Sequence, residues 1–368
     1  MRSPFQPNIG NPSCPQDGFM RLPPCGQGGN TECLTALPTR YTHVALNVGN
    51  PHQSSKKAGR TDMKIAKNIL ELIGHTPIVR LNRITREVKP EIWAKLEMFN
   101  PTGSVKDRIA LYMIEQAERK GILKKGGVIV EPTTGNTGIA LAAVAAIKGY
   151  RMIAVMSEAM SLERRRIIKA FGGEVVLTPA IEDAAGAISK AQEIVRTTPN
   201  SFMPDQFTNF DNIQAHKETT AREILEQTEG KLDVVVIAAG TGGTFSGVAE
   251  VLKKEIPEIK CVVVEPAGSA VLSGCDPGLH KIQGIGEGFI PECLKTHLCD
   301  EVIPVGDDEA INMARRLAKE EGILAGISSG ANVFAALQVA TKMEKGKILT
   351  FIPDSGQRYL TNELFANI

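Results

Sequence analysis

The sequence has no long apolar run and no excess of charge of either sign across its 368 residues. No stretch approaches the roughly 20 apolar residues that a membrane-spanning helix requires, so the sequence predicts no membrane protein. The formal net charge is +1, which gives no reason to expect nucleic acid or an anionic membrane as a partner. The alanine-rich stretch after Asn136 is predicted to form a buried helix.

Cysteine spacing excludes a metal centre of the zinc type. The seven cysteines form no CxxC pair and no cluster with histidine, so we expect no bound metal. With 42% hydrophobic and 23% charged residues, the composition is that of a globular protein with room for two domains. The odd number of cysteines favours free thiols and a cytoplasmic location.

Residues 1–62 form a segment of different character. They are rich in Pro and Gly and lack any helical or strand period. Such a segment buries too little apolar surface to offset its ordering entropy, so it is predicted to be a disordered extension. It lacks the apolar stretch of a signal peptide, and its composition leaves organellar targeting open. We expect Met63 to be the functional start and a chain that begins there to fold and work normally.

From Met63 on, short β-branched runs alternate with helical periods, which predicts an α/β fold with parallel-rich sheets flanked by helices. The predicted strands are 92–96, 128–130, 152–155, 174–177, 234–238, 261–264 and 348–351. The predicted helices are 105–119, 137–147, 161–171, 184–195, 213–226, 245–254, 307–320 and 332–343.

Residues 100–108 (NPTGSVKDR) place Lys106 at the turn between a predicted strand and a predicted helix. Strand-to-helix turns lie at the edge of the sheet where α/β proteins bind ligands. Loss of solvation there favours the neutral, nucleophilic amine, which can form a Schiff base. A solvated surface lysine at a helix start is the alternative.

Three further glycine- and hydroxyl-rich turns have the same context, namely 131–138 (EPTTGNTG), 240–244 (GTGGT) and 326–330 (GISSG). The second turn can wrap a phosphate group, because its glycines permit close approach and the following helix presents free N–H groups. It matches neither the dinucleotide fingerprint nor a Walker loop. A generic tight β–α turn is the alternative for this motif.

The four turns, in this order, resemble those of the cysteine synthase (O-acetylserine sulfhydrylase, A-type) family of fold-type II enzymes, which share the tryptophan synthase β-like fold and use pyridoxal phosphate (PLP). The resemblance covers about residues 63–368. It implies a two-domain α/β enzyme, with a small substrate-binding domain at 99–212 and a large PLP-binding domain formed by 63–98 and 213–368.

The resemblance also implies the roles of individual residues. Lys106 is identified as the Schiff-base lysine, which also moves the α-proton of the substrate. Asn136 corresponds to the asparagine that contacts the 3′-oxygen of the ring, although an Asx turn is an alternative. Cofactor binding further involves Gly240, Thr241, Gly242, Gly243, Thr244 and Ser328.

The substrate carboxylate is expected at Thr133, Thr134, Thr137 and Gln206, and the acetyl group near Gly284. The threonines are alternatively helix caps, and Gln206 an ordinary polar residue at a strand end. Thr134 departs from the serine that is usual in the family. Ser328 corresponds to the serine facing the pyridine nitrogen, whose hydroxyl leaves that nitrogen neutral, and Ser355 is the second choice.

Residues 280–291 resemble the loop over the acetyl group, where Glu287 replaces the usual alanine and no arginine occurs between Lys281 and Pro291. An ordinary glycine-rich surface loop is the alternative reading. The resemblance implies formation of L-cysteine and acetate from O-acetyl-L-serine and sulfide by a homodimer, with the C-terminal tail of serine acetyltransferase as a partner. Alternatives are cystathionine β-synthase activity, O-phosphoserine sulfhydrylase activity, or a PLP-fold binding partner of a regulator or of serine acetyltransferase.

Overall fold

A computed structural model describes residues 65–365 of the chain. The predicted extension at 1–62 lies outside the described residues. The strands are β1 (Ile78–Arg80), β2 (Glu91–Leu96), β3 (Val128–Pro132), β4 (Arg151–Ser157), β5 (Glu174–Thr178), β6 (Ser201–Phe202), β7 (Val234–Ala238), β8 (Lys260–Pro266), β9 (Glu301–Val305) and β10 (Lys347–Ile352).

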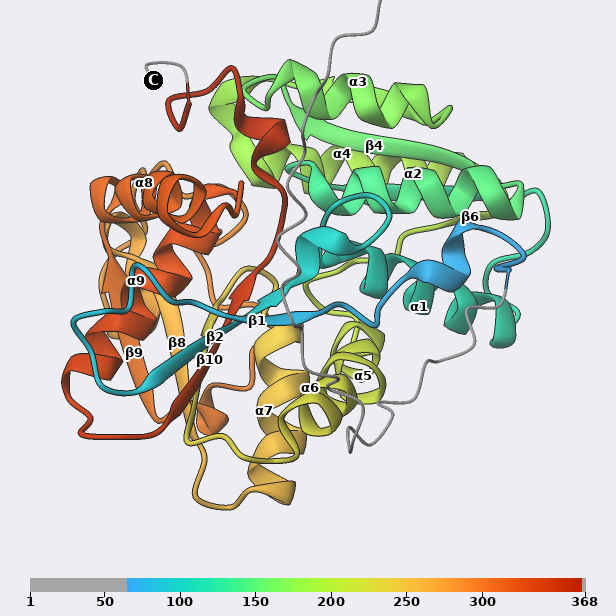
Figure 1. Ribbon diagram of the computed structural model, residues 1–368. Coiled ribbons are helices and arrows are strands. Elements are labelled where there is room, and N and C mark those ends of the chain that lie inside the picture. The colour runs from blue at the N-terminus through green and yellow to red at the C-terminus, as the bar shows by residue number, and fades with distance from the viewer. Residues whose placement is uncertain (1–64, 366–368) are drawn as a thin grey trace, which may run out of the picture. The chain divides into compact units, whose positions relative to one another are not determined.

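The α-helices are α1 (Lys106–Arg119), α2 (Asn136–Lys148), α3 (Leu162–Ala170), α4 (Asp183–Thr197), α5 (Asp211–Glu218), α6 (Thr220–Thr228), α7 (Gly243–Glu255), α8 (Asp307–Arg316) and α9 (Ile327–Thr341). Short 3₁₀ helices include η2 (Glu97–Phe99) and η8 (Gly356–Tyr359), and η7 (Leu317–Glu321) is a π-helical turn. Strands and helices alternate along the chain, as the predicted α/β fold requires (Figure 1).

The strands form two sheets, one of six strands in the order β1-β2-β10-β7-β8-β9 and one of four in the order β5-β4-β3-β6. Every pairing is parallel except that of β1 with β2. Parallel sheets are covered on both faces by their crossover helices. The prediction of parallel-rich sheets between helices is confirmed.

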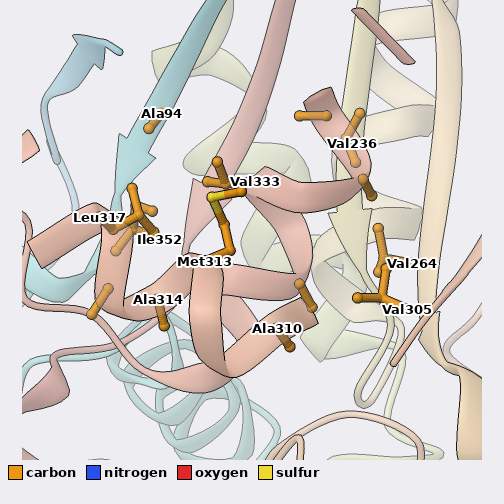
Figure 2. Close-up of a cluster of buried hydrophobic side chains, with 14 of the residues drawn as sticks. Ala94, Val236, Val264, Val305, Ala310, Met313, Ala314, Leu317, Val333 and Ile352 are labelled. Atoms are coloured by element: carbon orange, nitrogen blue, oxygen red, sulfur yellow. The ribbon is translucent and has the colours of Figure 1, made fainter. Parts of the chain in front are cut away.

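Alternation along the strands divides the core of the larger sheet into two layers. Val234 and Val236 of β7 pack in one cluster, whereas Val235 and Ile237 pack in another. Successive side chains of a strand point to opposite faces, which explains this split. Figure 2 shows the first layer, in which Met313 from α8 and Val333 from α9 cover side chains of the sheet.

The smaller sheet is covered in the same way. Val128 and Val130 of β3 pack with α4, and Ile129 packs in a cluster that includes residues of α1, α2 and α3. In Figure 1 the green helices α2, α3 and α4 lie beside β4 of this sheet, and α8 and α9 lie with the larger sheet. The predicted division into domains at 63–98, 99–212 and 213–368 stays a proposal.

Sequence reasoning missed β1, β6 and β9. β9 contains Pro304, which cannot donate to a ladder, and it is tolerated because β9 is an edge strand. β1 and β6 are only three and two residues long, too short to show a period.

Three of the predicted helices differ in extent. The helix predicted at 213–226 is two helices broken at Thr219, whose hydroxyl donates to the carbonyl of Ala215. Such back-bonding bends helices. The helix predicted at 307–320 changes to a π turn after Arg316. The helix predicted to start at 332 starts at Ile327, so the GISSG motif forms its first turn.

Candidate active site

The turns that follow β2, β3, β7 and β10 open onto one cavity. In α/β proteins such positions, beyond the carboxyl ends of parallel strands, are where ligands bind. Residues from both sheets line the cavity, so distant parts of the sequence meet there. Of the residues predicted from the sequence, those that line it are Lys106, Thr133, Thr134, Asn136, Thr137, Gln206, Gly240, Thr241, Gly242, Thr244, Gly284, Glu287 and Ser328.

Lys106 is the first residue of α1 and is half-buried in the cavity wall. Burial lowers the pKa of its amine, and the charges of Asp354 and Glu287 oppose that effect. The turn before it is fixed to the end of β10, because the N–H of Val105 donates to the carbonyl of Pro353 at 2.8 Å. The position in the cavity wall does not fit the alternative of a solvated surface lysine, and burial there favours the neutral form of the amine.

A cluster of four buried charges anchors the same helix. The guanidinium of Arg108 contacts Glu97 at 2.7 Å and Glu223 at 2.6 Å, and Lys95 contacts Glu223 at 2.8 Å. Burial opposes ionisation of Glu97, but the charge of Arg108 and its hydrogen bonds hold the pKa of Glu97 below its ordinary value. Arg108 lies two residues after Lys106, so the cluster fixes the start of α1 to η2 and α6.

The glycines of the 240–244 turn are required by close protein neighbours. A Cβ on Gly240 would lie 2.4 Å from the carbonyl oxygen of Gly284, and Gly242 has a φ of +85°. A Cβ on Gly243 would lie 1.9 Å from Oδ1 of Asn212, and Gly243 itself does not line the cavity. Tight packing therefore accounts for these glycines, and α7 begins at the turn with N–H groups that have no acceptor within the helix.

His216 lies behind this turn and contacts it directly. Its Nε2 is 3.1 Å from Oγ1 of Thr244, and its Nδ1 is 2.9 Å from Oγ1 of Thr220. Burial lowers the pKa of His216 to about 3, so the ring is neutral and has one donor and one acceptor nitrogen. If Nε2 carries the hydrogen, the Thr244 hydroxyl is left to donate into the cavity.

The 133–137 turn combines capping with a contact across the cavity. The hydroxyl oxygen of Thr133 accepts from the N–H of Gly135 at 3.0 Å and of Gly138 at 3.2 Å, as a helix cap does. Thr137 instead donates to Oε1 of Gln206 at 2.6 Å. The capping alternative therefore applies to Thr133, whose hydroxyl proton remains available, while Thr137 and Gln206 are brought together.

Asn136 is held by the segment after β10. Its amide donates to Oδ2 of Asp354 at 2.8 Å, and its Oδ1 accepts from Arg358. Tyr359 also donates to Oδ2 of Asp354, at 2.7 Å. These are long-range bonds, so the Asx-turn alternative does not account for Asn136.

Arg164 of α3 is a cavity residue that sequence reasoning missed. It is 2% exposed and donates to the carbonyl of Thr134 and to the hydroxyl of Tyr359, each at 3.1 Å. Its guanidinium lies 5.3 Å from the centre of the Tyr359 ring. Within the charged run 163–166, nothing in the sequence marks this arginine as the buried one.

Ser328 and Ser355 occupy different positions. Ser328 is in the first turn of α9, is 5% exposed and lines the cavity. Ser355 is not among the lining residues, and its side chain accepts from the N–H of Gln357 at the start of η8. The geometry therefore favours Ser328 over Ser355 as the hydroxyl that faces a ligand.

Comparison with known proteins decides the family. The protein family described as "Pyridoxal-phosphate dependent enzyme" matches residues 69–354 of the chain. The chain is 52% identical to cysteine synthase of Staphylococcus aureus over 305 residues. The aligned region covers 82% of this chain and 98% of that protein. The chain belongs to the PLP-dependent enzyme family.

Solved structures agree with this assignment. A cysteine synthase (OASS) from Entamoeba histolytica has a TM-score of 0.81 and 44% identity, and the match covers 86% of this chain and 95% of that one. An O-acetylserine-dependent cystathionine β-synthase from Helicobacter pylori has a TM-score of 0.79 and 40% identity, covering 82% of this PLP-dependent enzyme and 100% of the other chain.

The cavity of this PLP-dependent enzyme suits its cofactor. An amine at Lys106, N–H groups and threonine hydroxyls at the start of α7, and a hydroxyl at Ser328 surround one space. A helix start binds a phosphate dianion, and a serine hydroxyl suits a neutral pyridine nitrogen. Among residues 65–365, no group of three or more His, Cys, Asp or Glu side chains is placed to hold a metal ion.

Proposed function

We propose that this PLP-dependent enzyme forms L-cysteine and acetate from O-acetyl-L-serine and sulfide. The observation that carries the proposal is that the amine of Lys106, the glycine- and threonine-containing turn at 240–244 and the threonine-rich turn at 133–137 line one cavity. The 52% identity to a cysteine synthase over nearly its whole length supports the same reaction.

The cofactor would be held by groups at its two ends. The turn at 240–244 and the start of α7 would bind the phosphate, and Lys106 would bind the aldehyde carbon. Ser328 would face the pyridine nitrogen. When bound, PLP supplies an electron sink next to the α-carbon of the amino acid.

The substrate carboxylate would lie at the start of α2. Thr133, Thr134 and Thr137 offer hydroxyls at a helix N-terminus, which favours an anion. Gln206 adds an amide that Thr137 already orients. Gly284 would lie beside the acetyl group, because its loop packs directly on Gly240. This arrangement would point the β-carbon into the cavity.

Lys106 would move the α-proton. Its pKa is lowered by burial, so the neutral amine is available to remove that proton as acetate leaves, and to return it after sulfide adds to the β-carbon.

A turnover assay tests the reaction and its rivals. O-acetylserine, O-phosphoserine and serine are each paired with sulfide, thiosulfate and homocysteine. We expect the highest kcat/KM for O-acetylserine with sulfide. Homocysteine as the preferred acceptor would favour the second candidate, cystathionine formation, to which the Helicobacter pylori relative points. No turnover with any pair would favour a binding protein.

The identity of residue 328 is expected to control the ring nitrogen. Ser328→Asp should protonate that nitrogen and slow acetate release by at least about tenfold, which is about 1.4 kcal/mol in the barrier. Ser328→Ala should be much milder, because the nitrogen stays neutral. Single-turnover measurement of acetate release checks this. Equal rates for wild type and both variants would mean that Ser328 does not face the ring.

Glu287 is expected to disfavour O-phosphoserine. It lines the cavity and its charge acts on Lys106, and the phosphate ester adds roughly two negative charges near neutral pH. A unit like-charge contact at about 4 Å costs about 4 kcal/mol at an effective dielectric of about 20, and solvent lowers this. We therefore expect wild type to prefer O-acetylserine.

Glu287→Arg should raise the ratio of kcat/KM for O-phosphoserine to that for O-acetylserine by at least about tenfold. Glu287→Gln is the control, because it removes the negative charge without adding a cation, and its effect should be smaller. A wild-type preference for the phosphate ester would contradict the prediction and would point to Arg164 as the cation that reaches the substrate.

The homodimer, the serine acetyltransferase tail as partner and the cytoplasmic location are proposals that rest on the family resemblance. In the described part of the chain, no helix has the length and apolar character needed to cross a membrane. Light scattering of the purified enzyme measures the oligomer, and titration with a synthetic tail peptide measures the partner.

A further inference from the structure

The main chain at Gln206 is held by hydrogen bonds on both of its sides. On one side, Oε1 of Glu131 accepts from the N–H of Gln206 at 3.1 Å, and Oε2 accepts from the N–H of Asp205 at 2.9 Å. Asp205 has a φ of +51°, a left-handed conformation that lets successive N–H groups converge on one acceptor group. Glu131 is fully buried on β3, so the segment at 205–206 is fixed to the smaller sheet.

Asn212 holds the other side. Its Nδ2 donates to the carbonyl oxygen of Gln206 at 2.7 Å and to Oγ1 of Thr241 at 3.0 Å. Asn212 is fully buried in the first turn of α5. Its amide packs directly against Gly243, where a Cβ would not fit. One amide group therefore joins the carboxylate-binding residue Gln206 to the phosphate-binding turn.

We propose that Asn212 is a positioning residue that couples the substrate-carboxylate subsite to the phosphate-binding turn. This rests on the proposed function. The two N–H bonds of a planar amide are fixed relative to one another, so a displacement of Thr241 displaces Gln206 as well. The hydroxyl oxygen of Thr241 accepts from Asn212, and because Thr241 lines the cavity its hydroxyl proton would be available to a bound phosphate. Such coupling is reciprocal: an ordered phosphate turn favours carboxylate binding, and a bound carboxylate favours retention of PLP.

The alternative is that Asn212 stabilises the fold without coupling the two subsites. The two possibilities differ in how substitutions combine. If Asn212 couples the two subsites, then a change at Thr241 alters binding of the substrate carboxylate only while the Asn212 amide is present. If Asn212 is merely structural, a change at Thr241 leaves L-serine binding at saturating PLP unchanged in either background.

The test uses full-length holoenzyme of wild type, Asn212→Asp, Thr241→Val and the double variant. Asn212→Asp keeps the shape but replaces both N–H donors with a carboxyl oxygen, so Asn212→Leu, which has neither a donor nor a charge, is measured beside it. Two quantities are measured: the half-time of PLP loss in dialysis, and the dissociation constant of L-serine from the change in PLP absorbance at saturating PLP. Neither needs turnover, so the result is separate from the assay of cysteine formation, which tests the proposed function alone.

We expect Asn212→Asp to weaken L-serine binding at least about fivefold and to shorten the half-time of PLP loss by a similar factor. Thr241→Val should weaken L-serine binding in the wild-type background and have no further effect on it in Asn212→Asp. A change in only one quantity, or additive effects in the double variant, overturns the proposal. The KM of O-acetylserine should follow the L-serine constant, with a smaller change in kcat.

Asn209→Asp is the matched control. Asn209 lies in the same segment; its amide donates to the carbonyl of Pro204 at 2.8 Å, and its Oδ1, which the variant keeps, accepts from the N–H of Asp211 at 3.0 Å. It should leave both quantities close to wild type. If Asn212→Asp does not yield folded protein, Thr241→Val alone decides: weaker L-serine binding at saturating PLP supports the coupling, and unchanged binding overturns it.

Discussion

Lys106→Ala is expected to abolish cysteine formation while the chain still folds and binds PLP weakly. Lys106 would supply both the covalent contact to the cofactor and the base, and a positioned base alone contributes about 10²- to 10⁴-fold. We therefore expect kcat to fall by at least about 10³-fold. The turn at 240–244, which we propose binds the phosphate, is untouched, so weak binding of PLP should persist.

Two measurements check this prediction. Borohydride reduction of the wild-type holoenzyme, followed by peptide mapping, should place the pyridoxyl group on Lys106, and a label on another lysine would contradict the assignment. Lys120→Ala is the control. Lys120 directly follows the other end of α1, where it forms an exposed ion pair with Asp211. The Lys120→Ala variant should keep wild-type kcat and PLP content.

Arg108→Ala is expected to destabilise the protein by about 3–5 kcal/mol, because it leaves buried carboxylates without their partner. Glu97 is fully buried and would lose both of its bonds to Arg108, and Glu223 would keep only Lys95 and the backbone N–H of His75. The change also frees the start of α1, so activity should fall through misplacement of Lys106. Urea-unfolding midpoints measure the loss.

The matched control is Arg151→Ala. Arg151 also makes a two-bonded ion pair, with Glu174, but both side chains are about half exposed. Exposed pairs contribute about 0–1 kcal/mol, so this variant should unfold near the wild-type midpoint. Equal midpoints for the two variants would show that the buried cluster adds no stability beyond an exposed pair.

Acid unfolding measures the contribution of the buried charge cluster to stability independently. Burial opposes ionisation of Glu223, but Arg108 and Lys95 hold its pKa at about 2, below the ordinary 4.5. A carboxyl with a lowered folded-state pKa stabilises the fold above its ordinary pKa, and this stability is lost as the pH falls toward 2. Arg108→Ala should remove much of the pH dependence of the free energy of unfolding between pH 4.5 and 2.

The fold and the cavity-lining turns could be predicted because their signals are local. Five consecutive apolar residues predict β7 with both of its ends correct, and a turn that contains Pro and Gly indicates Lys106 as a site residue. Helix ends were harder. The start of α9 at Ile327 was missed because the GISSG motif has the composition of a loop, although its buried glycine and serines pack within the core.

The residues that support the site could not be predicted, because their partners are distant in sequence. Arg164 contacts Tyr359, which is 195 positions away, and Asn212 contacts Thr241 across 29 positions. Asparagine and arginine on helices are usually solvated, so neither stands out in a sequence. The glycines of the 240–244 turn were predicted for closeness to phosphate, whereas the structure shows that neighbouring protein atoms already require them.

The position of β10 in the larger sheet determines when the enzyme can first work during its synthesis. β10 lies between β2 and β7, although some 250 residues separate it from β2 along the chain. While the ribosome has not yet released residue 352, β1 and β2 have no connection through the sheet to β7, β8 and β9. The smaller sheet, complete by Phe202, can form earlier. Lys106 follows the first part and the turn at 240–244 belongs to the second, so we expect a nascent chain to hold PLP with both only after residue 352 has emerged.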